Sequence, residues 1–291
     1  MNFWIIAILA TLAYGVVSTV LDRRRPPPKA QAPSGRATGD PEQIARRVVE
    51  MAAPSLRLIP NGGPGFSKMG GDPDLPANIE WPQGAEGPLG FLLQIDLAEA
   101  HRHGGPEWLP PSGALYAFRD DRWGYADQVR ILHAPDGERA PRSPPAGVPR
   151  TWRHPQRPVT LAPETSLPSL LWLGEEAVGL DAQHPAWSLI PDLPCAPGPR
   201  HQLGGYPDEI QGEWLPMVCE FESRGLSYKH GQPIPPGLEA ASDSWRLLLQ
   251  IDSDDRLKMN WGGGGTLYVF VRETDARAGD FSRTVARPHF C

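Results

Sequence analysis

The stretch "LLLQIDSDDRLKMNWGGGGTLYVFV" at residues 247–271 decides how the rest of the sequence is interpreted. It begins and ends with an apolar run, and both runs have the length and composition of a buried strand. The segment between the runs is polar and ends in four glycines, Gly262 to Gly265. We therefore predict two successive strands joined by a glycine-rich connection, because glycine permits a tight reversal or a close backbone approach.

Both strands of this stretch have a counterpart earlier in the chain. Three blocks recur in the same order: "MGGDPDLPANIEW" (69–81) with "LGGYPDEIQGEW" (203–214), "FLLQIDLAEA" (91–100) with "LLLQIDSDDR" (247–256), and "GALYAF" (113–118) with "GTLYVF" (265–270). One short repeat would mean little, but three in register indicate duplication. We predict two copies of one structural unit, at about 55–134 and 169–291, joined by a proline-rich stretch at 135–168.

The composition indicates a sheet-rich protein. Of 291 residues, 31 are glycine and 35 are proline, and such punctuation favours short strands and loops over long helices. Short helices are expected at 40–54 with Asp40 as N-cap, at 97–103 after Asp96, and at 216–224. The predicted fold class is α+β: a sheet-rich domain made of two tandem related halves, preceded by one N-terminal transmembrane helix.

The N-terminus predicts a membrane anchor. Residues 3–21 carry no charge and are long enough to cross a hydrocarbon core of ~30 Å as a helix. Arginines follow the apolar run, in "DRRRPPPK" (22–29), so the positive-inside rule leaves the C-terminal part in the cytosol. We predict an anchor at 1–25, a proline-rich tether at 26–39 and a folded domain at 40–291, in a single-pass inner-membrane protein. An uncleaved signal sequence that exports the domain is the alternative.

Charge and cysteine content narrow the choice of partners. A net charge of −6 argues against a nucleic-acid partner, since no basic stripe is available to neutralise phosphates. Cys195, Cys219 and Cys291 are odd in number and far apart, which fits the cytosol better than a disulfide framework. The partners that follow are the inner membrane, through residues 3–21, and an unidentified small ligand or protein.

The opening stretch resembles three known site types, and its sequence excludes each. A calcium loop of the EF-hand type that starts at Asp252 would need an acidic or amide residue and then glycine where Arg256 and Leu257 stand. A P-loop needs lysine after the glycines, and Thr266 and Leu267 follow instead. A Rossmann turn leads into a helix, whereas "TLYVFV" has the composition of a strand. The glycine run either shapes the connection or lines a ligand site.

Residues that occur in only one of the two copies are the better candidates for function. We predict a cleft between the halves, because ligand sites favour such junctions. Its lining would consist of His201, Gln202, Asp208, Gln211, Asp254, Asp255 and Trp261. Gln94 and Gln250 occur in both copies within apolar strands, so they must find hydrogen-bond partners if buried. Their role is either structural, at the join of the copies, or in binding.

No pattern predicts a metal or a cofactor. A zinc site that combines His289 and Cys291 with His201 or Cys195 lacks the closely spaced ligand pairs of known zinc motifs. No G-x-S-x-G nucleophile elbow is present. Cys219, on an apolar helical face, is expected to be a core residue. The sequence therefore predicts neither a metal site nor a cofactor.

Several blocks together resemble the YwqG-like family of bacterial domains of unknown function. They are "GGDPDLPANIEWP", "PLGFLLQIDL", "LPPSGALYAF", "HQLGGYPDEIQGE", "LLLQIDSDD" and "WGGGGTLYVFV", with a terminal "C", and they span roughly residues 55–291. The resemblance implies an α+β fold built by tandem duplication, and it implies no reaction. Family members usually have Trp-Gly-Asp before the last strand, whereas Gly263 follows Trp261 and Gly262 here. If that aspartate served a ligand or a catalytic step, this chain lacks it.

Three hypotheses about function follow. The first is a non-enzymatic binding module at the cytoplasmic face of the inner membrane, with the cleft as its site. The second is a metal-assisted hydrolase in which Asp254, Asp255 and His201 converge on a divalent ion or a water molecule. The third is a scaffold for one protein partner, contacted through exposed tryptophans. The sequence favours a protein that is not an enzyme and leaves small ligand and protein partner open.

Overall fold

The computed structural model describes residues 40–63, 65–120, 129–169, 172–173, 184–190, 198–229 and 232–290. The predicted anchor and tether, and with them residues 3–21, lie outside this part of the chain. The chain divides into two compact units: Met1–Ala53 with Thr165–Gly198, and Pro54–Glu164 with Pro199–Cys291. The second unit carries the sheets and the candidate site.

The first unit contains a short amphipathic helix, α3 (Pro41–Glu50). Asp40 is its N-cap, as predicted, since its carboxylate accepts a hydrogen bond from the Glu42 N–H at 3.2 Å. One face of α3 joins a small apolar cluster with α5 (Ala186–Leu189). The cluster consists of Ile44, Ala45, Val48, Leu167, Leu173, Ala186 and Ile190. Among the described residues, no helix has the length and apolar character needed to span a membrane.

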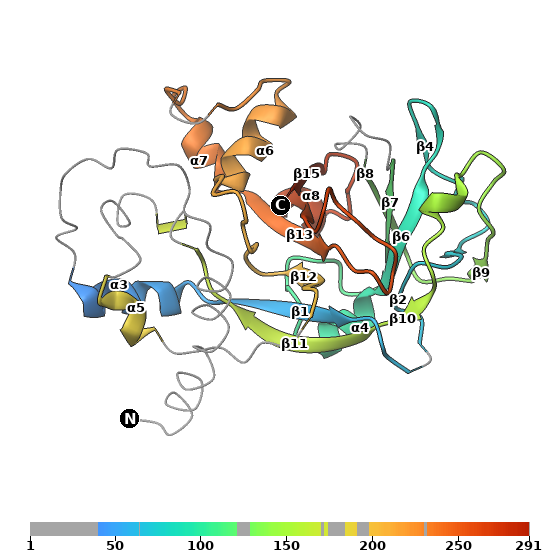
Figure 1. Ribbon diagram of the computed structural model, residues 1–291, viewed down its shortest axis with the longest axis horizontal. Coiled ribbons are helices and arrows are strands. Elements are labelled where there is room, and N and C mark those ends of the chain that lie inside the picture. The colour runs from blue at the N-terminus through green and yellow to red at the C-terminus, as the bar shows by residue number, and fades with distance from the viewer. Residues whose placement is uncertain are drawn as a thin grey trace. The chain divides into compact units, whose positions relative to one another are not determined.

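Two main sheets form the second unit (Figure 1). The six-stranded sheet has the order β11-β1-β12-β13-β14-β15, with β1 Ala53–Ile59, β11 Thr160–Ser166, β12 Gln202–Gly204, β13 Trp245–Asp252, β14 Thr266–Arg272 and β15 Val285–His289. The five-stranded sheet has the order β10-β2-β6-β7-β8, with β2 Lys68–Met69, β6 Gly90–Asp96, β7 Ala114–Arg119, β8 Val129–Ala134 and β10 Arg157–Pro158. Strand pairs β3 (Asp74–Leu75) with β9 (Ala140–Pro141), and β4 (Gln83–Gly84) with β5 (Gly87–Pro88), form two small ribbons.

One apolar core lies between the two sheets. Successive side chains of a strand point to opposite faces, so each sheet contributes one set of side chains to this core. Fully buried examples are Leu93 of β6, Leu115 of β7, Leu249 of β13 and Leu267 of β14. The chain passes from one sheet to the other twice, from β1 into β2 and from β10 into β11. Strands that change sheets in this way form the corners of a sheet-on-sheet packing.

The outer faces of the sheets are also covered. On the six-stranded sheet, α6 (Leu215–Ser223) packs Leu215 and Cys219 against Trp245, Leu247 and Phe270. Pro216 lies in the first turn of α6 and Gly225 follows its end in a left-handed conformation, as predicted. The other helices among the described residues are α4 (Leu97–Arg102), α7 (Leu238–Ser242), α8 (Glu273–Arg277) and the 3₁₀ turn η1 (Arg150–Trp152). Few short helices and several sheets confirm a sheet-rich α+β fold.

The hairpins β6–β7 and β13–β14 have matching registers. Gln94 pairs with Tyr116 in the first, and Gln250 pairs with Tyr268 in the second. Each hairpin has one irregularity at the same place, between Phe91 and Leu93 and between Leu247 and Leu249. Each is also preceded by two glycines in the left-handed region, Gly70 and Gly71 or Gly204 and Gly205. The sequence blocks that recur therefore occupy equivalent positions in the two sheets.

Candidate functional site

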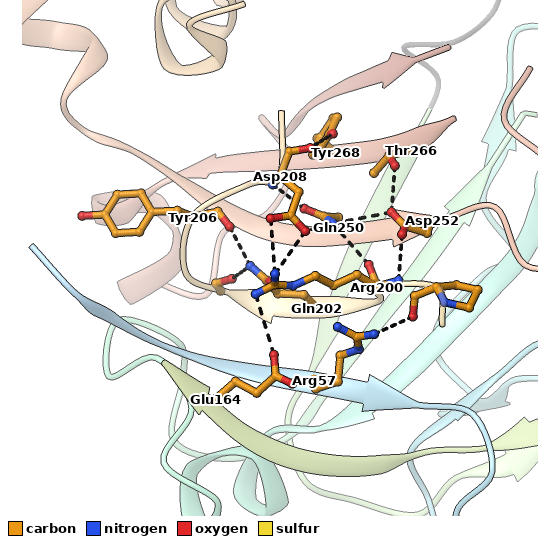
Figure 2. A network of polar contacts seen from close by, with 12 residues as sticks. Arg57, Glu164, Arg200, Gln202, Tyr206, Asp208, Gln250, Asp252, Thr266 and Tyr268 are labelled. Carbon is orange, nitrogen blue, oxygen red and sulfur yellow. Dashed lines mark hydrogen bonds and ion pairs between the residues drawn. The ribbon is translucent and has the colours of Figure 1, made fainter. Parts of the chain in front are cut away.

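A network of polar side chains lies on the outer face of the six-stranded sheet (Figure 2). Strand alternation creates it: Leu203 and Ile251 point into the core, whereas their neighbours Gln202 and Gln250 point to the opposite face. Gln202 and Gln250 stand opposite each other on β12 and β13. Polar side chains in this position require partners, and the loops on either side of β12 supply them.

Gln250 fastens the loop after β12 to the sheet. Its Oε1 accepts the Asp208 N–H at 2.9 Å, and its Nε2 donates to the Arg200 carbonyl at 3.3 Å. The Tyr268 hydroxyl donates to the Asp208 carbonyl at 2.5 Å. Burial raises the pKa of Tyr268 well above its ordinary value, and Asp208 and Asp252 reinforce the shift, so the hydroxyl stays a donor.

The other hairpin holds its own loop in the same way. Gln94 accepts the Asp74 N–H at 2.8 Å and donates to the Phe66 carbonyl at 2.8 Å. The Tyr116 hydroxyl donates to the Asp74 carbonyl at 2.7 Å. Burial raises the pKa of Tyr116 to about 12. A glutamine, a tyrosine and an aspartate thus form equivalent clamps in the two sheets.

The two clamps differ in the cation that they hold. Lys68 forms one ion pair with Asp74, at 2.7 Å. Arg200 pairs with Asp208 at 3.2 Å and Glu164 at 3.7 Å, and its Nε donates to Gln202 Oε1 at 3.1 Å. The side chains of Arg200 and Asp208 are 17% and 36% exposed, so this pair reaches the solvent.

Asp252 extends the network toward the end of β13. Its carboxylate accepts the Arg200 N–H at 2.7 Å and the Thr266 hydroxyl at 2.7 Å. The equivalent residue of β6, Asp96, instead caps α4 by accepting the Glu99 N–H at 2.8 Å, as predicted from its position. The second sheet thus uses this aspartate within the network.

A second polar group lies on the core side of the sheet. The ring Nε2 of His201 lies 3.3 Å from Asp254 Oδ2, and both side chains are almost fully buried. Arg256 binds the same carboxylate through two of its nitrogens, at 3.0 Å and 2.7 Å. Burial acts to raise the pKa of Asp254, but the bonds from His201 and Arg256 outweigh it and hold the pKa well below the ordinary value. The carboxylate is therefore a paired anion.

Asp254 also begins a tight reversal of the chain. Its backbone pairs with Met259, and its carbonyl accepts the N–H groups of Leu257 and Met259 at 3.1 Å each. Lys258, at the end of the reversal, has φ 52°, the left-handed conformation that side chains disfavour. The aspartates of the opening stretch thus shape a turn between β13 and the glycine run.

The tryptophan after this turn reaches the other sheet. Trp261 is 1% exposed, and the Arg119 guanidinium at the end of β7 lies 4.4 Å from its ring centroid. The His154 ring also contacts the turn through the backbone of Leu257 and Lys258, and burial lowers the pKa of His154. The turn therefore joins the two sheets at this end.

The glycine run is explained in part by close backbone contacts. A Cβ on Gly265 would lie 1.9 Å from the His289 carbonyl oxygen, and a Cβ on Gly113, at the equivalent position before β7, would lie 2.4 Å from the Ala134 carbonyl oxygen. A Cβ on Gly262 would likewise lie 2.3 Å from a ring carbon of Phe290. These glycines let β14 and β7 approach the neighbouring strand, which favours the structural interpretation for them.

His289 at the end of β15 belongs to a separate charged group. Its ring lies 3.2 Å from Glu213 Oε2 and packs edge-on against Tyr268. Arg287 also pairs with Glu213, at 3.4 Å. The hydrogen bond from His289, with the charge of Arg287, lowers the pKa of Glu213 to about 2. The zinc combination that the sequence argues against would also need Cys291, with His201 or Cys195; Cys195 and Cys291 lie outside the described residues.

The structure divides the seven predicted cleft residues. Gln202 and Asp208 come together in the network around Arg200, and His201 and Asp254 come together on the other face of the sheet. Asp255 is exposed, Trp261 is buried, and Gln211 is exposed and donates to the Phe290 carbonyl at 2.9 Å. Among the described residues, no group of three His, Cys, Asp or Glu side chains is placed to hold a metal ion.

Four network members were missed by the sequence reasoning: Arg57, Glu164, Arg200 and Asp252. Arg57 is 2% exposed and donates to the Pro199 carbonyl at 2.9 Å. Arg57 and Glu164 lie far from the recurring blocks, so nothing in the sequence links them to the site. Asp252 could have been found, because it follows the predicted strand directly and Asp96 is its counterpart.

Comparison with known proteins identifies a family and gives no function. No curated protein matches the chain. Residues 67–287 match the family described as "Domain of unknown function (DUF1963)", and the match covers both hairpins and the Arg200 network apart from Arg57. The match names no YwqG-like family, so that name stays a prediction. Since the matched segment covers most of the chain, the protein belongs to the DUF1963 family of domains of unknown function.

Proposed function

We propose that the protein is a membrane-anchored, cytosol-facing binding module that catalyses no reaction, with its recognition surface at the polar network around Arg200. The observation that carries this proposal is the Arg200–Asp208 pair. Both side chains reach the solvent, and hydrogen bonds to Gln202 and Gln250 together with the ion pair to Glu164 fix their positions. A fixed donor beside a fixed acceptor binds a polar ligand at low entropic cost.

The contrast between the two clamps supports this location. The Lys68–Asp74 pair performs the structural task of the clamp with one lysine, and Lys68 is 8% exposed. Arg200 adds contacts to Glu164 and Gln202 that the clamp itself does not require. A planar guanidinium presents several donors in a fixed geometry and is the better group for recognising carboxylates or phosphates. We propose that the hairpins arose by tandem duplication and that the second acquired the recognition surface.

The hydrolase alternative has less support from the geometry. Both Asp254 oxygens accept hydrogen bonds from Arg256, and His201 is fully buried. Asp255 is exposed on the turn. A metal ion or an attacking water would have to displace Arg256 from Asp254. The carboxylate that the hypothesis needs is thus already engaged in shaping the turn.

The anchor part of the proposal is carried by the sequence of residues 3–21. It is tested by fractionating cells that express the full chain with a C-terminal reporter that is active only in the cytosol. We expect the chain in the carbonate-resistant membrane fraction with an active reporter. A soluble chain would contradict the anchor, and a membrane-bound chain with an inactive reporter would contradict its orientation.

Ligand binding is tested by thermal unfolding of the full chain in nanodiscs, against divalent metals, nucleotides, sugars and peptidoglycan fragments. A ligand at a hundred times its dissociation constant adds about 2.7 kcal/mol to stability. Asp208→Asn keeps the backbone contacts of the clamp and removes the charge, so it should abolish the ligand-induced rise in Tm. The matched control is Asp74→Asn in the other clamp, which should keep it. An equal rise in both variants would place the site elsewhere.

A further inference from the structure

The segment between the hairpins β6–β7 and β13–β14 includes a stretch that is unusually basic for this chain. Residues 139–163 contain Arg139, Arg142, Arg150, Arg153 and Arg157 and no aspartate or glutamate, although the chain as a whole has a net charge of −6. A local excess of one sign in an acidic protein attracts a partner of the opposite sign.

Two of these arginines are used within the fold. Arg139 lies over the Phe66 ring, with 4.9 Å between its guanidinium carbon and the ring centroid, and its side chain is 12% exposed. Arg142 donates to the carbonyls of Ile79 and Pro76. These two side chains stabilise loops near the hairpin β6–β7, and little of their charge is available to a partner.

The other three arginines are exposed and form what we call the arginine ridge: Arg150, Arg153 and Arg157. Arg150 and Arg153 are three residues apart on η1 and its C-cap, and side chains at this spacing on a 3₁₀ turn lie one above the other. Arg157 follows on β10, at the edge of the five-stranded sheet.

The ridge is held in place by buried neighbours. Trp152 is 7% exposed and lies against Gly90. A Cβ added to Gly90 would be 3.0 Å from the Cβ of Trp152. The His154 side chain is 6% exposed, and its carbonyl accepts the Gly71 N–H at 2.9 Å. Since the residues between the arginines are anchored in the fold, the arginines themselves are presented outward on a fixed backbone.

The ridge arginines have no acidic partners in the described part of the chain. The one side-chain hydrogen bond that they make there is from the Arg153 guanidinium to the Val148 carbonyl at 3.3 Å. Other exposed arginines of this unit are ion-paired, such as Arg277 with Glu273 at 2.8 Å and Arg283 with Asp275 at 3.0 Å, and the exposed Arg102 and Arg130 stand singly and form no row. The ridge is therefore a row of uncompensated cations.

We propose that the arginine ridge binds the anionic headgroups of the bilayer that anchors the chain. The inference rests on the proposed membrane anchor, which places the unit beside the cytoplasmic leaflet, where negative lipids attract basic residues. A tether of residues 26–39 spans up to about 50 Å when extended, so the unit can reach the bilayer surface. The ridge would hold one face of the unit to the membrane and leave the Arg200 network to the ligand.

The test uses the full chain in nanodiscs of phosphatidylcholine alone or with phosphatidylglycerol. Gln156, exposed between Arg153 and Arg157, is changed to cysteine and labelled with an environment-sensitive fluorophore. Cys195 and Cys291 are replaced by serine for this purpose. Cys219 can stay, since it is buried and its pKa is raised by burial, which makes the thiol unreactive.

We expect a blue shift of the label only in discs that contain phosphatidylglycerol, and its loss in 1 M salt. Each arginine should contribute about a five-fold preference for the docked state, so Arg150→Gln, Arg153→Gln and Arg157→Gln together should lower the docked-to-free ratio about a hundred-fold. The matched control changes Arg246, Arg277 and Arg283 to glutamine. It removes the same charge from ion-paired sites and should leave the shift unchanged.

Failure of the anchor and failure of the ridge give different results. A chain that inserts into the discs but shows the same label spectrum with both lipids overturns the ridge and leaves the anchor intact. A chain that does not insert overturns the anchor. Flotation with phosphatidylglycerol vesicles then tests the ridge alone, and an absence of arginine-dependent binding would overturn the ridge as well. If a short RNA shifts the label through the same arginines and the lipid does not, the ridge binds nucleic acid and the membrane proposal is wrong.

Discussion

Replacing Gln250 by leucine should destabilise the protein by about 2–6 kcal/mol. Gln250 is 1% exposed, and its amide satisfies the Asp208 N–H and the Arg200 carbonyl. Leucine fits the strand and the apolar surroundings, but it leaves both backbone groups without this partner. Each buried polar group that loses its partner costs about 1–3 kcal/mol, and the two together give the stated range.

The assay is urea unfolding of the full chain, with the midpoint as the measured quantity and an unchanged slope as evidence that the folded state keeps its compactness. Gln94→Leu should cost at least as much, because Gln94 makes the equivalent bonds at 2.8 Å. Gln83→Leu is the control, since Gln83 is exposed and donates only to the Trp81 carbonyl. A Gln250→Leu variant within about 0.5 kcal/mol of the parent, the range of ordinary surface changes, would refute the clamp.

Three further predictions concern the turn, the glycine run and the C-terminal charges. Lys258→Gly should stabilise the protein by about 0.5–1 kcal/mol in urea unfolding, because Lys258 has φ 52°, and Lys258→Ala should give no gain. Gly265→Ala should cost at least about 3 kcal/mol or abolish folding, since its Cβ would lie 1.9 Å from the His289 carbonyl oxygen. Gly137→Ala is the control and should be tolerated, because its Cβ would meet no atom. Equal urea midpoints for the two variants would contradict the close approach of Gly265 to His289. The pKa of Glu213 is about 2 in the folded state, so its stabilising contribution is present above pH ~4.5 and is lost as the pH falls toward 2. Glu213→Gln should remove roughly 1–2 kcal/mol of acid-dependent stability over that window, and an unchanged pH profile would contradict the pairing with His289.

Local sequence signals predicted the elements well. The apolar runs at 91–95 and 247–251 are strands, and the caps at Asp40 and Asp96 begin helices as expected. The reason is that strand alternation and capping depend on residues close in sequence. The tandem duplication stays a prediction, although each recurring block carries its own turn and strand.

The polar network could not be predicted to the same extent. The sequence predicts that Gln250 needs partners and that Asp208 is a candidate site residue, but Arg57 and Glu164 reach the network only because β1 lies beside β12 and β11 lies beside β1 in the sheet (Figure 1). That strand order is a property of the folded chain and leaves no local pattern. The same limit explains why His201 and Gln202, adjacent in sequence, were assigned to one cleft: neighbours on a strand point to opposite faces.

The most direct test of the binding proposal is a calorimetric titration of the full chain with a compound found by thermal unfolding, followed by mass analysis of that compound after prolonged incubation. We predict saturable binding that weakens at least about ten-fold in Asp208→Asn, stays within about two-fold in Asp74→Asn, and leaves the compound chemically unchanged. Equal weakening in both variants would show that the Arg200 network is only a clamp, and turnover of the compound would show that the protein is an enzyme.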